Sequence, residues 1–261
     1  GPLWTTSRQG HVPSMRVQDL EPALLQNRVF ARMVPAHFKA LLATAEVMEV
    51  ARGERVLEEA DPSQHLYALT HGVVGVFYSS TAGADVLVKI FGAPAVFGEM
   101  ELVHGQPRQE YVEAFEDCVV VRVNGRAFMD TLQKDSGACF VMLQDVAARL
   151  CIAAYNERAL AFLDAPTRLA GLFLSFLEAY GQPGDDGITL GYKLTYDMLA
   201  RCLGVTARSI DRTMTTWMEE GWVRRSKGLY TFSALEELER RSDPEGLALF
   251  STLGLLPHRG G

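Results

Sequence analysis

Short apolar runs alternate with turn residues through the first half of the chain. The runs lie at 66–69, 73–78, 86–91 and 118–123, and glycine, proline and aspartate separate them at intervals of roughly ten residues. This pattern predicts a small antiparallel β sandwich or barrel. An apolar stretch with helical spacing over 23–42 precedes it, and we expect this stretch to pack against one end of the barrel.

The middle of the chain predicts one long helix. From 138 to 163 there is neither glycine nor proline, and alanine, leucine, arginine and glutamate are abundant. Positions at alternating spacings of four and three resemble the seam of a coiled-coil dimer; they are Cys139, Leu143, Val146, Leu150, Ala153, Glu157 and Leu160. The prediction is a dimer seam formed by Leu143, Val146, Leu150, Ala153 and Leu160. The alternative is a helix that packs on its own domain.

The last third of the chain predicts a helix-turn-helix. A helix over 167–180 and a glycine, proline and aspartate loop over 181–187 come first. Thr195 then caps a short helix, and Gly204 supplies the sharp turn after it. Thr206 caps a second helix, whose first turn leaves backbone N–H groups free for a phosphate. Two short helices joined in this way form the corner found in many DNA-binding proteins.

The second helix and the hairpin after it carry the candidate DNA contacts. Arg208 and Arg212 lie one turn apart, so both can present a guanidinium fork to guanine in the major groove. Residues 223–232 predict a hairpin with a basic tip, a wing whose cations hold phosphates. The candidate contacts are Thr195, Thr206, Ala207, Arg208, Ser209, Arg212, Arg224, Arg225 and Lys227. The alternative is a helical corner in an enzyme, with a solvated basic face.

Composition and charge restrict the function classes. The 261 residues are 48% hydrophobic and 22% charged, which excludes a mainly disordered chain. No apolar run approaches the ~20 residues of a membrane span, so we expect no membrane contact. The net charge of −7 alone argues against nucleic acid, yet 201–227 holds six cations and three carboxylates. A basic module on an acidic body is the pattern of a protein that meets DNA at one end.

The cysteines favour neither a metal site nor a disulfide. Cys118, Cys139, Cys151 and Cys202 stand singly among apolar neighbours, so we expect no metal and predict buried free thiols. Free thiols indicate a reducing compartment, and we expect the cytoplasm. Because no Ser-His-Asp, zinc or phosphate-loop pattern is present, we predict no catalytic residue and no enzyme activity.

Several motifs together resemble the CRP/FNR family, the bacterial regulators typified by the catabolite activator protein and the fumarate-nitrate regulator. They are Phe-Gly-Glu-Met at 97–100 with Arg108, Leu-Ala-Phe-Leu-Asp at 160–164, and Leu-Gly-Val-Thr-Ala-Arg-Ser-Ile-Asp-Arg at 203–212. The resemblance covers about 25–235. It implies an α+β protein with an N-terminal cyclic-nucleotide-binding-type β jelly roll, a long dimerisation helix and a C-terminal winged helix-turn-helix.

The sequence patterns and the resemblance together indicate the partners and the division of the chain. The partners are double-stranded DNA with two-fold symmetry, a second copy of the chain, and RNA polymerase. We expect a tag remnant and arm at 1–22, the jelly-roll sensor at 23–136, the dimerisation helix at 137–164, the winged helix-turn-helix at 165–235 and a C-terminal extension at 236–261. The alternative function is a ligand-binding module whose C-terminal domain serves protein interaction.

The sensor departs from the nucleotide-binding members of the family. There, a Gly-Glu pair holds the ribose and an Arg-Ser/Thr pair holds the cyclic phosphate. Here Gln109 replaces the hydroxyl residue, Glu110 adds a negative charge, and Ala153 and Ala154 replace two hydroxyls that face adenine. The candidate pocket residues are Gly98, Glu99, Met100, Arg108, Gln109, Ala153 and Ala154. We expect no tight binding of cyclic AMP.

Two alternatives remain open for the pocket and its cofactor. Either it binds another small-molecule or nucleotide effector, or it is vestigial and Glu99 forms an internal ion pair with Arg108. The iron-sulfur members carry an N-terminal cysteine cluster, whereas no cysteine precedes Cys118. Haem needs an axial ligand, for which the sequence offers the isolated histidines His65, His71 and His104. No cofactor is therefore assigned.

The recognition helix also departs from the best-known pattern of the family. Ala207 and Arg208 stand where that pattern has an Arg-Glu pair, so we expect a different operator. Arg212 matches the deeper arginine of the family, and we expect it to contact a base.

Overall fold

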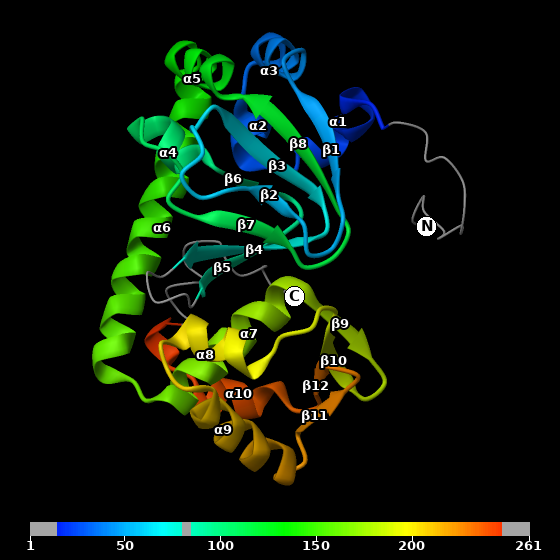
Figure 1. The fold of residues 1–261 in the computed structure, drawn as a ribbon, viewed down its shortest axis with the longest axis vertical. Coiled ribbons are helices and arrows are strands. Elements are labelled where there is room, and N and C mark those ends of the chain that lie inside the picture. Colours follow the sequence, from blue (N-terminus) through cyan, green and yellow to red (C-terminus); the bar gives the residue numbers. More distant parts are fainter. Residues whose placement is uncertain (1–14, 80–84, 247–261) are drawn as a thin grey trace.

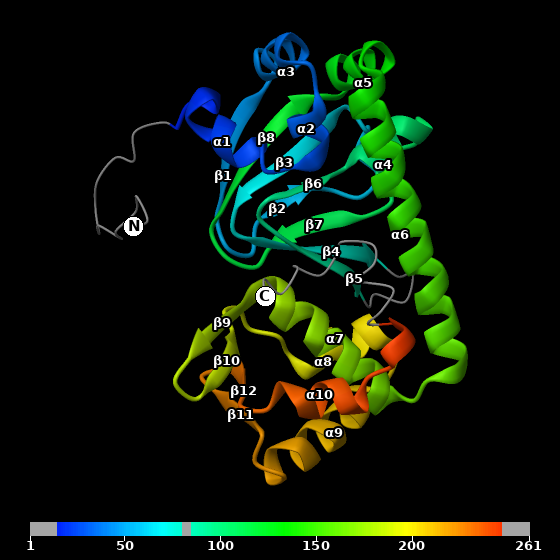
Figure 2. The same ribbon diagram turned by 180° about the vertical axis from the view of Figure 1, so that it is seen from behind.

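The computed structural model describes residues 15–79 and 85–246 and has three parts (Figure 1). A β-rich half lies at one end, a long helix runs along its side, and a smaller half of helices and hairpins lies beyond it; Figure 2 shows the same parts from behind. This is the predicted α+β architecture. Most of the arm expected at 1–22, and the end of the extension expected at 236–261, lie outside the described residues.

Short helices cover one end of the β-rich half. They are η1 (Val17–Leu20), α1 (Glu21–Leu24), α2 (Arg28–Arg32) and α3 (Pro35–Leu42), where the sequence predicted one helical stretch. The stretch is divided because the Asn27 side chain caps α2 and Pro35 starts α3. Phe30 and Phe38 are buried against the barrel residue Val123, as the apolar spacing predicted.

The β-rich half is an antiparallel sandwich. Within the described residues it has two four-stranded sheets. One has the order β1 (Glu46–Val50), β8 (Cys118–Asn124), β3 (His65–His71) and β6 (Ala95–Phe97), and the other has the order β2 (Arg55–Leu57), β7 (Tyr111–Ala114), β4 (Val73–Ser79) and β5 (Asp85–Gly92). Val74 and Val120 are fully buried between the sheets. The four apolar runs form β3, β4, β5 and β8, so their prediction is confirmed.

Helix α6 (Ser136–Phe162) is the long helix predicted over 138–163. It follows α5 (Gly125–Lys134), and the buried carboxylate of Asp135 fixes its start. That carboxylate accepts hydrogen bonds from the backbone N–H groups of Ala138 (3.1 Å) and Val34 (2.6 Å), which joins α6 to α3. Ala138 and Met142 pack on the barrel, and α6 then continues past it toward the smaller half (Figure 1).

The smaller half is a helix-turn-helix unit. Its helices are α7 (Ala165–Tyr180), α8 (Tyr196–Leu203), α9 (Ala207–Glu219) and α10 (Leu235–Arg241). Phe173 of α7, Met214 of α9 and Leu238 of α10 are fully buried in one core. Because α10 packs along α7, the folded unit continues to Arg241 and does not end at 235.

A small sheet completes this half, in the order β11 (Val223–Ser226), β12 (Leu229–Phe232), β10 (Gly187–Leu190) and β9 (Gly181–Gly184). The predicted hairpin at 223–232 is present as β11 and β12. The predicted loop at 181–187 is instead part of a second hairpin, so that prediction is wrong. Strand β9 lies at the edge of the sheet, where Pro183 is tolerated although it lacks a backbone N–H.

The smaller half is docked on strand β5 of the barrel. Leu87 of β5 belongs to the same buried cluster as the apolar residues of α7 and α8. The Gly92 N–H donates to the Tyr180 hydroxyl (2.7 Å), and Arg201 donates to the Asp85 carbonyl (2.7 Å). Glycine is required at 92 because a Cβ atom there would lie 2.0 Å from the Tyr180 ring.

Candidate functional site

Two threonine caps and one glycine build the helix-turn-helix corner. The Thr195 hydroxyl accepts the backbone N–H of Met198 (3.1 Å) at the start of α8, and the Thr206 hydroxyl accepts that of Ser209 (3.2 Å) at the start of α9. Between the helices, Gly204 has φ 62°, in the left-handed region that glycine adopts at little cost. Both caps and the turn are present as predicted.

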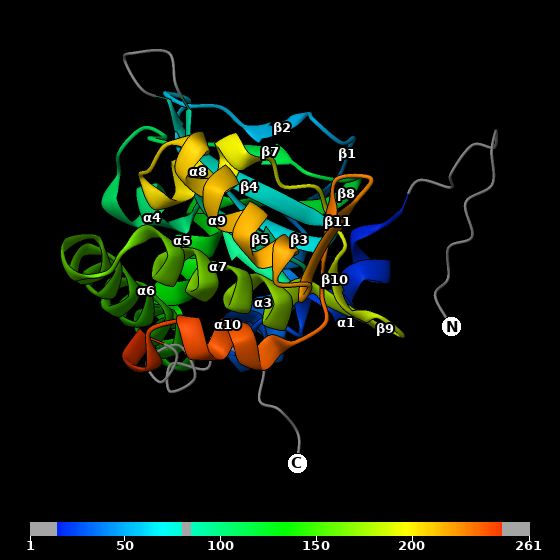
Figure 3. The ribbon, with the colours of Figure 1, turned by 90° about the horizontal axis from the view of Figure 1, so that it is seen from below.

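Helix α9 presents two guanidinium groups to solvent. Ile210 and Met214 are buried and fix the helix on α7 and α8. Arg208 and Arg212 are exposed on the other side. In the part of the chain that the structure describes, neither arginine forms an ion pair or a hydrogen bond through its side chain. In the view from below, α9 lies nearer the viewer than the barrel (Figure 3). It is therefore on the side of the DNA-binding half that faces away from the barrel.

The wing carries three exposed cations at its strands and tip. Lys227 and Gly228 have φ 50° and 85°, the geometry of a tight hairpin turn. Arg224 pairs with Asp186 of the neighbouring hairpin at 2.9 Å. Arg225 lies with its guanidinium carbon 4.8 Å from the centroid of the Tyr196 ring. The ring and the carboxylate orient these two arginines, and Lys227 is at the tip.

The other predicted contacts belong to the helix-turn-helix corner. Thr195 and Thr206 are exposed, whereas Ala207 and Ser209 are half-buried and Ala207 also packs against the core. The structure adds Lys193, because its side chain lies beside the wing turn, 3.2 Å from where a Cβ of Gly228 would be. The sequence signal for Lys193 is its place two residues before the cap of α8.

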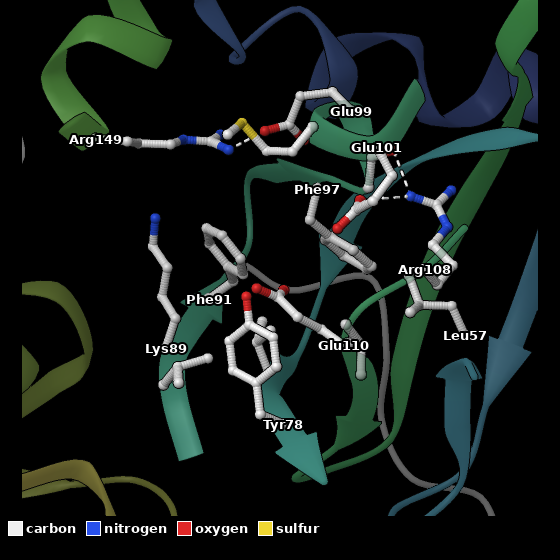
Figure 4. A pocket seen from close by; sticks show the side chains of 15 residues that line it. Leu57, Tyr78, Lys89, Phe91, Phe97, Glu99, Glu101, Arg108, Glu110 and Arg149 are labelled. Atoms are coloured by element: carbon white, nitrogen blue, oxygen red, sulfur yellow. Dashed lines mark hydrogen bonds and ion pairs between the residues drawn. The ribbon is translucent and has the colours of Figure 1, made fainter. Parts of the chain in front are cut away.

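The barrel contains a cavity of about 230 Å³ between β4, β5, α4 (Glu99–His104) and α6 (Figure 4). The residues that line it are Leu57, Val76, Tyr78, Val88, Lys89, Phe91, Phe97, Gly98, Glu99, Met100, Glu101, Arg108, Glu110, Val112 and Arg149. This set includes the predicted residues Gly98, Glu99, Met100 and Arg108. It does not include the predicted residues Gln109, Ala153 and Ala154, which are exposed.

Arg108 is bound within the protein. Its side chain is 3% exposed, and one terminal nitrogen donates to the Gly98 carbonyl (2.6 Å) and to Glu101 (3.1 Å). The other terminal nitrogen donates to the carbonyl of His65. Gly98 has φ 80° and leaves room for the guanidinium, since a Cβ there would lie 3.1 Å from it. Arg108 therefore links the loop before β7 to β3 and α4 as a structural cross-link.

Glu99 pairs with a different arginine from the one expected. The internal pair predicted as an alternative was Glu99 with Arg108, whereas Glu99 pairs with Arg149 of α6 and Arg108 pairs with Glu101. Glu99 is 1% exposed, and its second oxygen, Oε2, is buried without a hydrogen-bond partner among the described residues. Arg149 was not among the predicted pocket residues, because α6 passes the cavity one turn before Ala153.

Lys89, Tyr78 and Glu110 form the rest of the polar lining. Burial and the nearby Arg149 lower the pKa of Lys89 to about 8, while Glu110 acts in the opposite direction. Burial raises the pKa of Glu110, and the hydrogen bond from the Tyr78 hydroxyl limits this rise. Burial and the same hydrogen bond raise the pKa of Tyr78 to about 12. A lysine within the apolar run at 86–91 was the sequence signal for Lys89.

The outer face of α6 is an exposed apolar stripe. Leu143, Leu150 and Leu160 of the predicted seam are 61%, 71% and 59% exposed, and Ala153 is also exposed. Val146 is different, because it lies one turn after Met142 and packs on the barrel as Met142 does. Within the described residues, α6 is the helix long and apolar enough to cross a membrane by length and composition, with a mean hydropathy of 1.5.

The cysteines differ from the prediction of buried thiols. Cys118 is buried, and burial raises the pKa of its thiol to about 11. Cys202 is half-buried, but Cys139 and Cys151 are exposed on α6, so the prediction is wrong for these two. The described residues contain no group of metal-ligating side chains that could hold an ion, and no histidine lines the cavity.

Comparison with known proteins gives a family for both halves. The family described as "Cyclic nucleotide-binding domain" matches residues 47–135, and "Crp-like helix-turn-helix domain" matches residues 167–241. The chain belongs to the CRP/FNR family. It is a CRP/FNR-type transcriptional regulator with a helix-turn-helix DNA-binding domain, and the alternative of a protein-interaction module is not favoured.

Individual relatives are distant and cover most of the chain. A "CRP-like cAMP-activated global transcriptional regulator" of Mycobacterium tuberculosis is 22% identical over 85% of this chain and 100% of its own. A "Global nitrogen regulator" of Synechococcus elongatus is 25% identical over 65% of this chain and 77% of its own. The solved structure of FixK2 from Bradyrhizobium japonicum has a TM-score of 0.67 at 16% identity, covering 76% and 98% of the two chains.

Proposed function

We propose that this CRP/FNR-family regulator acts as a homodimer on a two-fold symmetric DNA site. The observation that carries the proposal is the pair of exposed, unpaired guanidinium groups of Arg208 and Arg212 on a helix whose other side is anchored in the core. In the dimer, two copies of α9 about 34 Å apart enter successive major grooves. Arg212 contacts a base, while Arg224, Arg225 and Lys227 hold phosphates.

The apolar stripe of α6 supports the dimer. Leucines exposed by 59–71% on one face of a 27-residue helix need a partner surface, and a second α6 supplies one with the same sequence. Glu157 and Arg158 are exposed and interrupt the apolar surface of α6 with charge. A membrane would leave these charges in hydrocarbon, whereas a dimer leaves the end of α6 that carries them in contact with water.

The proposed regulator does not respond to cyclic AMP. Arg108, the cation that the family uses for the cyclic phosphate, is engaged by two carbonyl oxygens and Glu101. Glu110 lines the same cavity and brings a carboxylate close to where a phosphate would lie. The engaged Arg108 and the Glu110 carboxylate both disfavour binding of a cyclic phosphate at the position that the family uses for it. We further propose that the protein works in the cytoplasm, contacts RNA polymerase at promoters and has no enzyme activity.

Selection of bound fragments from a random DNA pool tests the DNA-binding part. We expect a two-fold symmetric consensus with half-sites about one helical turn apart. Binding without sequence preference, or no binding in a mobility-shift assay, would contradict the proposal. The fraction bound should fall steeply with salt, because phosphate contacts release counterions.

Sedimentation equilibrium of a Leu150→Glu variant tests the dimer. Two glutamates facing each other across the seam repel and lose the buried leucine pair, so we expect monomers and loss of binding to the symmetric site. Val103→Glu on α4 is the matched control, because Val103 is similarly exposed and is not part of the stripe. A wild-type chain that is monomeric at micromolar concentration would refute the dimer.

A further inference from the structure

Two cations outside the family motif meet in the barrel cavity. Lys89 comes from β5 and Arg149 from α6, and both point toward the side of the cavity where Glu99 lies (Figure 4). Arg108 lies on the other side in the same view, and both its terminal nitrogens already donate hydrogen bonds within the protein. Arg149 pairs with Glu99 but is 26% exposed, whereas Arg108 is 3% exposed, so the positive charge that a ligand can reach is that of Lys89 and Arg149.

Lys89 has no ion-pair partner among the described residues, and its ammonium lies 4.5 Å from the centroid of the Phe91 ring. The Glu110 carboxylate in the same cavity attracts Lys89 at longer range and accepts a hydrogen bond from the Tyr78 hydroxyl. An ammonium group taken out of water without an anion is unstable, and burial lowers the pKa of Lys89 to about 8 accordingly. A ligand that places an anion here would replace the lost hydration.

Glu99 supplies the complementary group. Its Oε1 pairs with Arg149, but Oε2 is buried without a donor in a side chain that is 1% exposed. A buried acceptor that lacks a partner costs about 1–3 kcal/mol, so a ligand hydroxyl that donates to Oε2 would be favourable. A ligand that satisfies both residues therefore offers an anionic oxygen to Lys89 and a hydrogen-bond donor to Glu99.

The apolar walls and the volume limit the size of the ligand. Phe91 and Phe97 are stacked, with centroids 5.9 Å apart, and present carbon surface to the cavity. The volume of about 230 Å³ lies below the ~300–1,000 Å³ of sites for drug-sized ligands. A cyclic dinucleotide is larger than such ligands and does not fit the cavity as it stands.

We propose that this cavity binds a small hydroxylated anion, with its anionic oxygens on Lys89 and Arg149 and a hydroxyl group on Glu99. Sugar phosphates and sugar acids share this chemistry. The site is distinct from the phosphate position at Arg108. The inference goes beyond the proposed DNA-binding function and is tested without DNA.

Such a ligand would contact both elements that lead to the DNA-binding half. Lys89 and Leu87 are two residues apart and would share a face of a regular strand. They lie on opposite faces of β5 because the register of its pairing with β4 shifts between them. Leu87 packs with the DNA-binding half, whereas Lys89 lines the cavity. Arg149 is on α6, beside the proposed dimer seam. A ligand that binds one arrangement of β5 and α6 better than another would shift the position of α9.

Isothermal titration of the full chain with ribose 5-phosphate and with gluconate tests the proposal. We expect at least one probe to bind with Kd below about 1 mM, and Lys89→Met to weaken that binding at least about tenfold. Lys39→Met is the matched control, because Lys39 is exposed on α3 outside the cavity, and it should leave Kd unchanged. If only ribose 5-phosphate binds, the ligand class is a sugar phosphate. If only gluconate binds, it is a sugar acid.

A double variant tests the second contact without leaving a lone buried charge. Glu99→Gln with Arg149→Gln should abolish probe binding while circular dichroism shows a folded protein. The proposal is overturned if neither probe binds, if binding survives Lys89→Met, or if cyclic AMP binds equally well to wild type and to Lys89→Met. A protein that selects a DNA consensus but binds neither probe would refute this inference and leave the proposed function intact.

Discussion

The winged helix and the barrel cavity both depend on arginines, but they use them in opposite ways. Arg208 and Arg212 extend from α9 into solvent, and in the described residues their guanidinium groups have no partner. Arg108 is 3% exposed, and both its terminal nitrogens donate to groups of the protein itself. The difference shows that a family motif identifies the residue, while exposure and existing partners decide whether its charge is available to a ligand.

The largest expected effect comes from removing Arg108. Arg108→Ala leaves Glu101 and two carbonyl groups without their donor, and breaking a pair with a buried partner costs about 3–5 kcal/mol. Urea unfolding of the full chain measures this loss.

Arg122→Ala is the control for Arg108→Ala. Arg122 pairs with Glu46, and the two side chains are 38% and 67% exposed, so its loss should cost less than about 1 kcal/mol. Equal effects of the two variants would show that the cavity arginine is no more structural than a surface one.

Lys89→Met should stabilise the protein. The folded pKa of about 8 lies below the ordinary lysine value of 10.5, so the unfolded chain binds more protons between these pH values. The wild-type free energy of unfolding should therefore rise from pH 8 to 10.5 and be flat below pH 8 as far as this group is concerned. Methionine removes this cost, which is about 3 kcal/mol at pH 7, and the free energy of unfolding of the variant should not rise between pH 8 and 10.5 on account of this group. A wild-type and variant difference that does not depend on pH would count against this account.

Arg212→Ala should weaken specific DNA binding by about 1–3 kcal/mol and relax one base preference, with unfolding unchanged. Arg224→Ala is the comparison, because a phosphate contact should weaken binding to all sequences alike and lower the salt slope by about 1. A fluorescence titration on matched and mismatched sites separates the two. Unchanged specificity in Arg212→Ala would remove it from the base contacts.

Thr206→Ala has the smallest expected effect. The hydroxyl that accepts the Ser209 N–H is lost, which costs about 1 kcal/mol of stability. Thr216→Ala is the control, since the Thr216 hydroxyl bonds to the Arg212 carbonyl inside the same helix and caps nothing. Thermal unfolding of both variants gives the difference, and a cap effect no larger than the control would show that the start of α9 is held by its packing.

The DNA-binding half could be predicted because its signals are local. Thr195, Gly204 and Thr206 act on residues within three or four positions of themselves, so the corner follows from the sequence. The hairpin β9–β10 could not, because glycine and proline at 181–187 indicate a loop, and its pairing to β12 depends on residues more than forty positions away.

The cavity could be predicted in part. Gly98, Glu99 and Arg108 follow from the motif, but their partners do not. Arg149 reaches Glu99 across fifty positions, and Glu101, two residues from Glu99, takes the arginine that Glu99 was expected to hold. Pairing between side chains on different elements depends on how those elements pack, which the periodicity of each element alone does not contain.

The placement of β5 limits how this regulator can change through evolution. A single layer of backbone separates the cavity from the core of the DNA-binding half, with Lys89 on one side and Leu87 on the other. A substitution that reshapes the strand for a new ligand also moves the surface on which α8 rests. We therefore expect substitutions in β5 that change what the cavity accepts to change the packing of the DNA-binding half as well.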